Sequence, residues 1–159
     1  MKCNPGPIGA SIVVLLAGLA TGGAVATAPT ASAQQVWGAC GISTPEDKVV
    51  ATYSMGTLRC GNRGWGFRHI QGSHLNDWQR LADIEGRNWR DIADMAIAKS
   101  MSNPDVQRSV GSDRHCYSGQ IYLVNKVRGT IEATAQPTVI VNTATGNIVT
   151  AYPGGGCRV

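Results

Sequence analysis

The segment Asn88–Ala98, NWRDIADMAIA, predicts an amphipathic helix that must pack against a core. Its apolar residues recur at intervals of three and four positions, which places them on one face of a helix. These residues are Trp89, Ile92, Ala93, Ala96 and Ile97. Asn88 is a favourable N-cap with Asp91 at the N3 position, and Asn103-Pro104 ends the helix.

A second helix is expected immediately before this one. Asn76 can act as its N-cap, with Gln79 three residues later as the capping-box partner. Apolar residues then follow helical spacing up to Gly86, which ends the helix because glycine readily adopts the left-handed conformation. The two helices are therefore predicted to follow one another with a short connection.

The C-terminal half of the chain predicts strands. Alternating or β-branched runs separated by turn residues indicate strands at 120–125, 130–134, 137–141 and 147–152. Before the helices, residues 49–53 begin a stretch that is rich in β-forming residues and loops. Helices followed by an antiparallel meander define an α+β fold. We expect N-terminal helices packed on one face of a twisted antiparallel sheet of four to five strands.

The first 33 residues have the layout of a secretory signal peptide. Lys2 provides a positive start, residues 8–28 are uncharged and largely apolar, and Ala31-Ser32-Ala33 is a small-x-small cleavage site. A retained membrane anchor is the alternative, because the apolar run approaches the length of about 20 residues that spans a bilayer. We expect cleavage and secretion with no stable membrane anchor, an N-terminal arm at 34–48 and one domain at 49–159.

Four cysteines remain after the expected cleavage, and an even number in an exported chain implies two disulfides. Three pairings are possible; we favour Cys40–Cys60, which would tie the arm, and Cys116–Cys157, which would hold the C-terminal tail. The formal net charge of the whole chain is +4, a mild excess that permits a polyanionic partner without requiring one.

Two of the three histidines lie close together in the segment Gly66–His74, GFRHIQGSH. Five residues of a regular helix turn by about 500°, so His69 and His74 would not share a helix face, and Gly72-Ser73 between them indicates a loop. Imidazoles act as acid or base near neutral pH. With Arg68 adjacent, the pair suits RNA cleavage by the 2′-hydroxyl, one histidine accepting its proton and the other protonating the leaving oxygen.

This segment resembles the "His-Ile-x-x-x-His" signature of the barnase–EndoU–colicin–RelE-like ribonuclease toxins. The similarity continues in order through a helical pair, Cys116-Tyr117-Ser118, the IYLVN strand at 121–125 and a terminal hairpin ending in Thr-Ala-Tyr-Pro at 150–153. It covers about residues 61–153 and points to an exported, actinobacterial-type member. One departure is Ser73, at a position where relatives often carry a lysine.

The resemblance implies a metal-independent endoribonuclease without cofactors, cleaving RNA to a 2′,3′-cyclic phosphate. His69 and His74 are then the acid and base, and Thr150 binds the phosphate or orients a histidine. Arg68 or Lys126 stabilises negative charge in the transition state. We expect RNA as substrate, an immunity protein as a further partner, and a monomer.

Two further residues are candidates for substrate binding. Tyr117 would stack on a base or bind phosphate, and Trp65, between two glycines, would be exposed for stacking. Two other functions stay open. The first alternative is a secreted binding module that has lost catalysis. It is compatible with Ser73, and a secreted protein would not meet a cytoplasmic RNA target in its own cell. The second is a zinc-dependent hydrolase in which His115 joins the other two histidines as a ligand.

Overall fold

The computed structural model describes residues 37–158; the expected signal peptide and residues 34–36 of the arm lie outside the described residues. The elements, in chain order, are β1 (Val49–Tyr53), β2 (Gly56–Arg59), α1 (Gly66–Glu85), α2 (Trp89–Ser102), β3 (Val106–Ser109), β4 (Arg114–Ser118), β5 (Ile121–Asn125), β6 (Thr130–Ala135), β7 (Thr138–Asn142) and β8 (Ile148–Tyr152).

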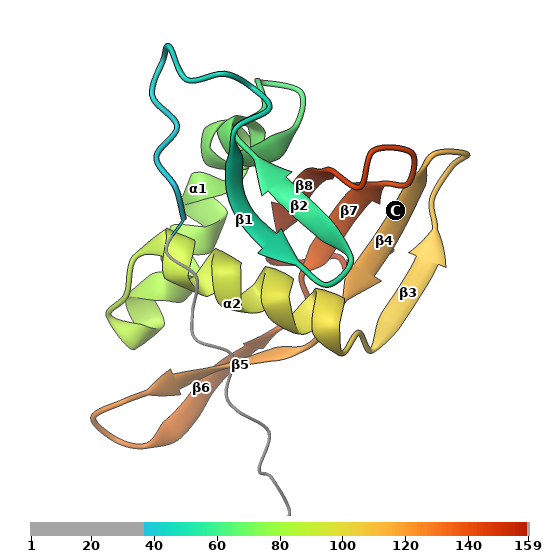
Figure 1. Cartoon of the computed structure of the whole chain (residues 1–159). Coiled ribbons are helices and arrows are strands. Elements are labelled where there is room, and N and C mark those ends of the chain that lie inside the picture. Colours follow the sequence, from blue (N-terminus) through green and yellow to red (C-terminus); the bar gives the residue numbers. More distant parts are fainter. Residues whose placement is uncertain (1–36, 159) are drawn as a thin grey trace, which may run out of the picture. The chain divides into compact units, whose positions relative to one another are not determined.

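The fold is α+β, with two helices packed against a four-stranded antiparallel sheet of order β3-β4-β7-β8 (Figure 1). Two small hairpins, β1-β2 and β5-β6, accompany this sheet. The expected class and sheet size are confirmed. The expected N-terminal position of the helices is wrong, because the β1-β2 hairpin precedes them and the helices lie in the centre of the domain sequence.

The expected meander is divided between two sheets. The strands β5 and β6 pair with each other, whereas β7 and β8 pair with β4 and, through it, with β3. The strand β3 was not predicted, because all four of its residues are exposed and it carries no alternating apolar pattern. Pro137 precedes β7 and cannot donate to a strand ladder, which separates β6 from β7.

Helix α2 begins and ends as predicted. The Asn88 side chain accepts hydrogen bonds from the backbone N–H groups of Arg90 and Asp91, at 2.9 and 3.2 Å, and donates to the Asp91 carboxylate at 2.7 Å. Asn103 is the C-cap. The predicted apolar face is buried, from Trp89 to Ile97.

Helix α1 ends at the predicted Gly86, which has a left-handed φ of 64°, but it begins eleven residues earlier than expected. Its first residue is Gly66, so Asn76 and Gln79 lie in mid-helix and form no N-terminal cap. A glycine within a helix, such as Gly72, costs about 1 kcal/mol relative to alanine. Burial of Phe67 and Ile70 in the core offsets this cost, and local propensity is overridden.

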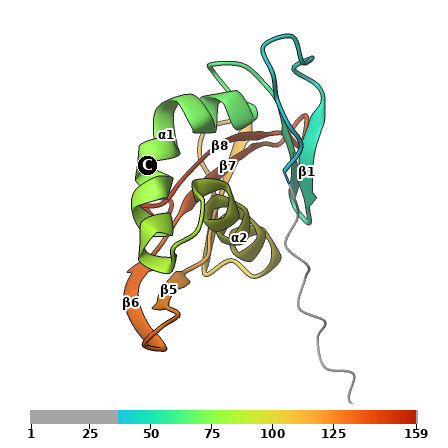
Figure 2. The same ribbon diagram turned by 90° about the vertical axis from the view of Figure 1, so that its left-hand side faces the viewer.

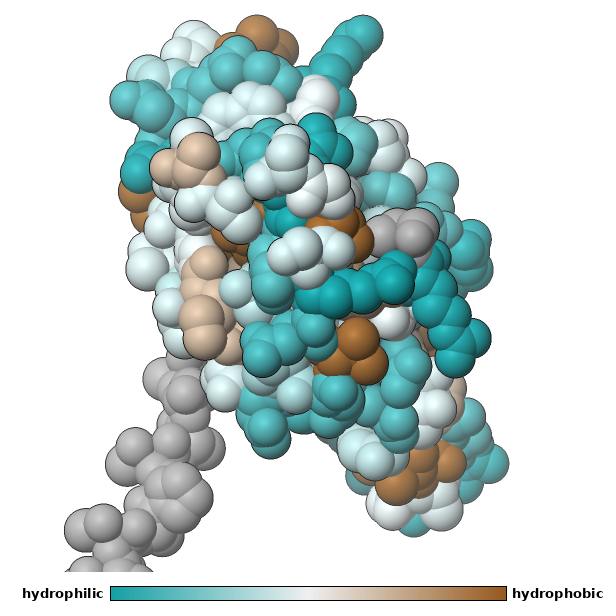
Figure 3. Space-filling view, turned by 90° about the vertical axis from the view of Figure 1, so that its right-hand side faces the viewer, coloured by the Kyte–Doolittle hydropathy of each residue, from teal (hydrophilic) through white to brown (hydrophobic). Residues whose placement is uncertain are grey.

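The core lies between the helices and one face of the sheet. Trp78 of α1 is fully buried, and its indole Nε1–H donates to the carbonyl oxygen of Ala151 in β8 at 3.1 Å. Figure 2 shows α1 running beside β8. On the face in Figure 3, hydrophobic residues are scattered in small groups over a mostly hydrophilic surface, as is usual for a solvated face.

The N-terminal arm is fixed by a buried polar contact. The Asp94 carboxylate on α2 accepts hydrogen bonds from Trp37 Nε1 at 3.0 Å and from the Tyr53 hydroxyl at 2.6 Å. Burial and the adjacent Asp94 charge raise the pKa of Tyr53, which therefore stays protonated and keeps donating. The ring of Trp37 also packs edge-on against Phe67 and Trp89.

Both favoured disulfides, Cys40–Cys60 and Cys116–Cys157, are present. The first joins the arm to the end of β2, and the second joins the C-terminal tail to β4. Such bonds persist in oxidising compartments and indicate an extracytoplasmic environment. Within residues 37–158, no helix is long and apolar enough to cross a membrane.

Removing the Cys116–Cys157 bond by the double substitution Cys116→Ser and Cys157→Ser should lower the free energy of unfolding by about 4 kcal/mol. The reason is that the bond closes a loop of 41 residues in the unfolded chain. Urea unfolding of the oxidised protein and the double variant measures the difference. An unchanged unfolding midpoint would show that the disulfide does not stabilise the fold.

Candidate functional site

His69 and His74 both lie in α1, so the expected loop between them is wrong. Their imidazole rings nevertheless meet, with centroids 5.6 Å apart in an edge-on arrangement. The two positions are about 140° apart around the helix axis, so the rings approach one another from adjacent sides of α1. The helix therefore assembles the pair that the sequence analysis placed in a loop.

The orientation of His69 is set by the turn that precedes α1. Its Nδ1 lies 2.8 Å from the carbonyl oxygen of Arg63. A carbonyl only accepts hydrogen bonds, so Nδ1 carries the proton and Nε2 is the nitrogen left for chemistry. The turn itself requires close backbone approach, because a Cβ on Gly66 would lie 2.7 Å from the carbonyl oxygen of Arg59.

His74 is oriented by an acidic residue one turn further along α1. Its Nδ1 lies 3.5 Å from Asp77 Oδ2, and the other oxygen of Asp77 accepts a hydrogen bond from Arg80 at 2.6 Å. The ring of Tyr152 in β8 lies 5.2 Å from the His74 ring. Helix and sheet thus meet at His74.

Burial lowers the pKa of His74 below its usual value of 6.5, and the nearby His69 adds a smaller lowering effect. The hydrogen bond and the charge of Asp77 act in the opposite direction and raise it. The net result is a histidine that is mainly neutral at pH 7 and able to accept a proton.

Thr150 and Tyr152 occupy one face of β8. They are two residues apart in a regular stretch of the strand, where Thr150 pairs with Ile140 and Tyr152 pairs with Thr138. Within the described residues, the buried hydroxyl of Thr150 makes no hydrogen bond. An unsatisfied buried hydroxyl is costly, so Thr150 is a polar group whose presence the packing of the fold does not explain.

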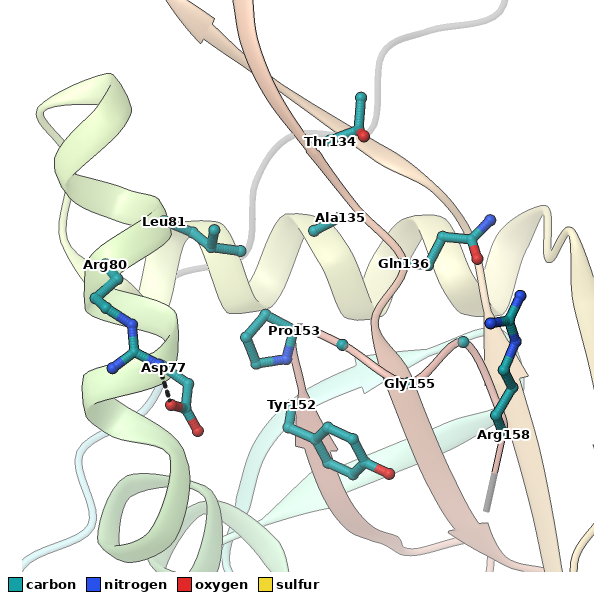
Figure 4. A pocket seen from close by; sticks show the side chains of 12 residues that line it. Asp77, Arg80, Leu81, Thr134, Ala135, Gln136, Tyr152, Pro153, Gly155 and Arg158 are labelled. Carbon is teal, nitrogen blue, oxygen red and sulfur yellow. Dashed lines mark hydrogen bonds and ion pairs between the residues drawn. The ribbon is translucent and has the colours of Figure 1, made fainter.

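A cavity of about 710 Å³ adjoins His74. Figure 4 shows Asp77 and Arg80 on the α1 side and Tyr152 and Arg158 opposite, with Pro153 between them. Asp77 and Tyr152 belong both to this cavity and to the immediate surroundings of His74. A ligand bound in the cavity would therefore lie next to the histidine pair.

Arg68 is occupied by the backbone. Its guanidinium donates hydrogen bonds to the carbonyl oxygens of Gly61, Gly41 and Thr44, and so ties the arm to α1. These contacts assign it a structural part, and its expected contact with substrate stays a prediction. Its cation is nevertheless near the surface, where it lines a cavity of about 370 Å³ with Arg63 and Ser73.

The structure does not gather the other expected residues around the histidines. Lys126 lies in the turn between β5 and β6, a hairpin that does not pair with the main sheet. Tyr117 pairs with Val139 and packs on the core side of the sheet, opposite to the face that carries Thr150. Trp65 lines a separate cavity of about 420 Å³ with Arg114.

No role at the site was predicted for Asp77, Arg80, Tyr152 or Arg158 from the sequence. The signal for the first two was present, because His74, Asp77 and Arg80 recur at intervals of three and would share a helix face. That signal depended on starting α1 at Gly66. Tyr152 and Arg158 come from distant segments, so only the tertiary structure relates them to His74.

A three-histidine zinc site is not assembled. His115 lies on β4, where its ring contacts Tyr117 at 4.8 Å between centroids. In residues 37–158, no group of three His, Cys, Asp or Glu side chains is arranged to hold a metal ion. The donor set that the zinc-dependent alternative requires is therefore not found in the described part of the chain.

The chain is similar to two proteins of Mycobacterium tuberculosis, uncharacterized protein MT0764 of strain CDC 1551 / Oshkosh and uncharacterized protein Rv0739 of strain ATCC 25618 / H37Rv. Each is 30% identical over 138 residues, which cover 75% of this chain and 50% of the relative. The chain thus spans about half the length of these curated relatives. No family model and no solved structure matches.

The substitution Asp77→Asn should lower the pKa of His74 further, because it removes the charge that raises it. An NMR titration of the histidine ring protons measures the shift, with His115 as an internal reference. The control is Asp83→Asn, which removes an equal charge from an exposed position of α1. A His74 pKa that stays the same or rises in Asp77→Asn would contradict the assigned contact.

The lowered pKa of His74 also links stability to pH. The unfolded chain binds a proton at this residue more readily than the folded chain does. The stability that the folded protein gains from a neutral His74 is therefore fully present above about pH 6.5. It is lost as the pH falls from that value through the pKa of the folded state. Urea unfolding at pH 7.5 and pH 5.5 should show a smaller loss of stability in His74→Gln than in the unmodified protein.

Proposed function

We propose that the protein is a metal-independent endoribonuclease that cleaves RNA by transesterification. The observation that carries the proposal is the contact between His69 and His74, each held through Nδ1 so that Nε2 is left for the substrate. The resemblance of residues 61–153 to the barnase–EndoU–colicin–RelE-like toxins supports the same reaction and belongs to the proposal.

His74 is the general base in this mechanism. It is mainly neutral at pH 7, so its Nε2 accepts the proton of the 2′-hydroxyl as that oxygen attacks phosphorus. The carboxylate of Asp77 next to Nδ1 then stabilises the imidazolium that forms. The same arrangement of a carboxylate behind a histidine fixes the tautomer in other acid–base sites.

His69 is the general acid. The Arg63 carbonyl accepts the Nδ1 proton in both protonation states of the ring, so the ring keeps its orientation throughout the reaction. Protonated His69 gives the proton on Nε2 to the leaving 5′-oxygen. A bond forms between the 2′-oxygen and phosphorus, the bond between phosphorus and the 5′-oxygen breaks, and the products are a 2′,3′-cyclic phosphate and a 5′-hydroxyl.

Thr150 contributes a hydrogen bond to the phosphate. Its buried hydroxyl has no partner within the described residues, and it lies on the same strand face as Tyr152, which contacts His74. A preorganised donor of this kind gains strength as negative charge develops on the phosphate oxygens. We propose that the reaction takes place outside the cytoplasm of the producing cell, in a secreted monomer whose activity an immunity protein blocks.

A binding module without catalysis is the second candidate. The observation that favours it is the engagement of Arg68 by three backbone carbonyls, together with a serine at position 73. A binding module of this kind would bind RNA in the site and release it unchanged. Retention of RNA without turnover therefore separates the two functions.

Cleavage of RNA by the oxidised full chain in EDTA tests the proposal. The variants His69→Ala and His74→Ala should each lose about 10²- to 10⁴-fold in kcat/KM, because each removes one partner in proton transfer. His115→Ala, which removes a histidine on β4 that contacts Tyr117 instead of the histidine pair, should keep full activity. Products ending in 2′,3′-cyclic phosphate are expected. Cleavage that survives in both variants, or that requires a divalent metal, would contradict the mechanism.

Thr150→Val separates function from stability. Valine has nearly the same shape and carries no unsatisfied hydroxyl, so the free energy of unfolding should stay equal or increase, while kcat falls about tenfold or more. Thr138→Val is the contrasting variant, because it removes a hydroxyl that donates to Gly154 O and accepts from Cys157 N. It should destabilise the fold by about 1–2 kcal/mol. Equal activity of Thr150→Val and the unmodified enzyme would remove Thr150 from the mechanism.

A further inference from the structure

The cavity beside His74 is formed by three segments that are distant in the sequence. Helix α1 contributes Asp77, Arg80 and Leu81, the connection between β6 and β7 contributes Gln136, and the chain after β8 contributes the glycine-rich tail and Arg158 (Figure 4). Its volume of about 710 Å³ lies within the range of small-molecule sites, about 300–1,000 Å³.

The tail that forms one wall of the cavity is held in a defined conformation. The buried Thr138 hydroxyl donates to the Gly154 carbonyl at 2.7 Å and accepts from the Cys157 N–H at 3.2 Å. Cys157 is in turn bonded to Cys116 on β4. A Cβ on Gly155, whose φ is +85°, would lie 2.9 Å from the Thr138 hydroxyl and 3.3 Å from the Tyr152 ring. The wall is therefore part of the folded structure.

The groups around the cavity combine one available cation with an apolar surface. Arg158 is exposed, and within the described residues its guanidinium forms no hydrogen bond or ion pair. The charge of Arg80 is instead compensated by Asp77 at 2.6 Å. In Figure 4, Leu81 lies beside Arg80 on α1, and Pro153 lies next to the Tyr152 ring, between α1 and Arg158. An anion beside a flat apolar group fits this arrangement.

We propose that this cavity binds the nucleotide adjoining the scissile one, with its base against Leu81, Pro153 and Tyr152 and its phosphate at Arg158. The inference rests on the proposed function and specifies its substrate as single-stranded RNA. A base in this recess must leave the stack and its pairing partner, which a duplex resists and a single strand permits. Because Tyr152 also contacts His74, the bound nucleotide would be continuous with the reacting phosphate.

Binding of short 2′-O-methyl oligonucleotides tests this subsite without cleavage, because the attacking hydroxyl is blocked. The probes are a dinucleotide and two trinucleotides, one lengthened at the 5′ end and one at the 3′ end. The oxidised full chain should bind one trinucleotide about tenfold more tightly than the dinucleotide, as expected for one stacked base. Isothermal titration calorimetry gives the dissociation constants.

Arg158→Gln should reduce this gain to less than about threefold and leave dinucleotide binding unchanged. The matched control is Arg128→Gln, which removes an equal charge from the β5-β6 hairpin and should keep the tenfold gain. Arg158 is exposed at the end of the tail, so its substitution should not disturb folding; urea unfolding verifies this.

Equal binding of the dinucleotide and both trinucleotides, or the same gain in Arg158→Gln and the unmodified protein, would overturn the subsite. Failure of the proposed function gives a different result. Unmodified RNA of the same lengths would then remain uncleaved while the tenfold gain in binding and its dependence on Arg158 persist.

Discussion

The placement of α1 against β8 is the constraint on which the site depends. The indole of the buried Trp78 donates to the carbonyl of Ala151, which fixes the helix along the strand at the point where β8 carries Thr150 and Tyr152. His74 lies one helical turn before Trp78, and its ring therefore contacts the Tyr152 ring. Packing in the core thereby sets the geometry of groups at the surface.

The sequence predicted the elements whose signals are local. Asn88 and Gly86 mark helix ends through their own hydrogen-bonding and backbone preferences, and the alternating strands β5 to β8 were found within one or two residues. The start of α1 was missed because Gly72-Ser73 is a local break signal that core burial overrides. The pairing of β7 with β4 was also missed, since strand order is a tertiary property.

The candidate site was predicted only in part, because some of its residues have local signals and others are brought together by the tertiary structure. The histidine pair and Thr150 stood out by residue type and by resemblance, whereas Asp77 became relevant once both histidines were on a helix. Tyr152 and Arg158 approach through the fold, and Arg158 is positioned by a tail that Thr138 and the Cys116–Cys157 bond hold. One disulfide that indicates an oxidising environment also shapes the cavity next to His74.

The pH dependence of kcat/KM for RNA cleavage tests the central claim, that His74 is the base and His69 the acid. We predict that kcat/KM rises with pH as His74 loses its proton and becomes able to act as base. In Asp77→Asn this rise should move to lower pH, because Asp77 raises the pKa of His74. A profile that is flat between about pH 5 and pH 8, or a rising limb that does not move in Asp77→Asn, would contradict the assignment.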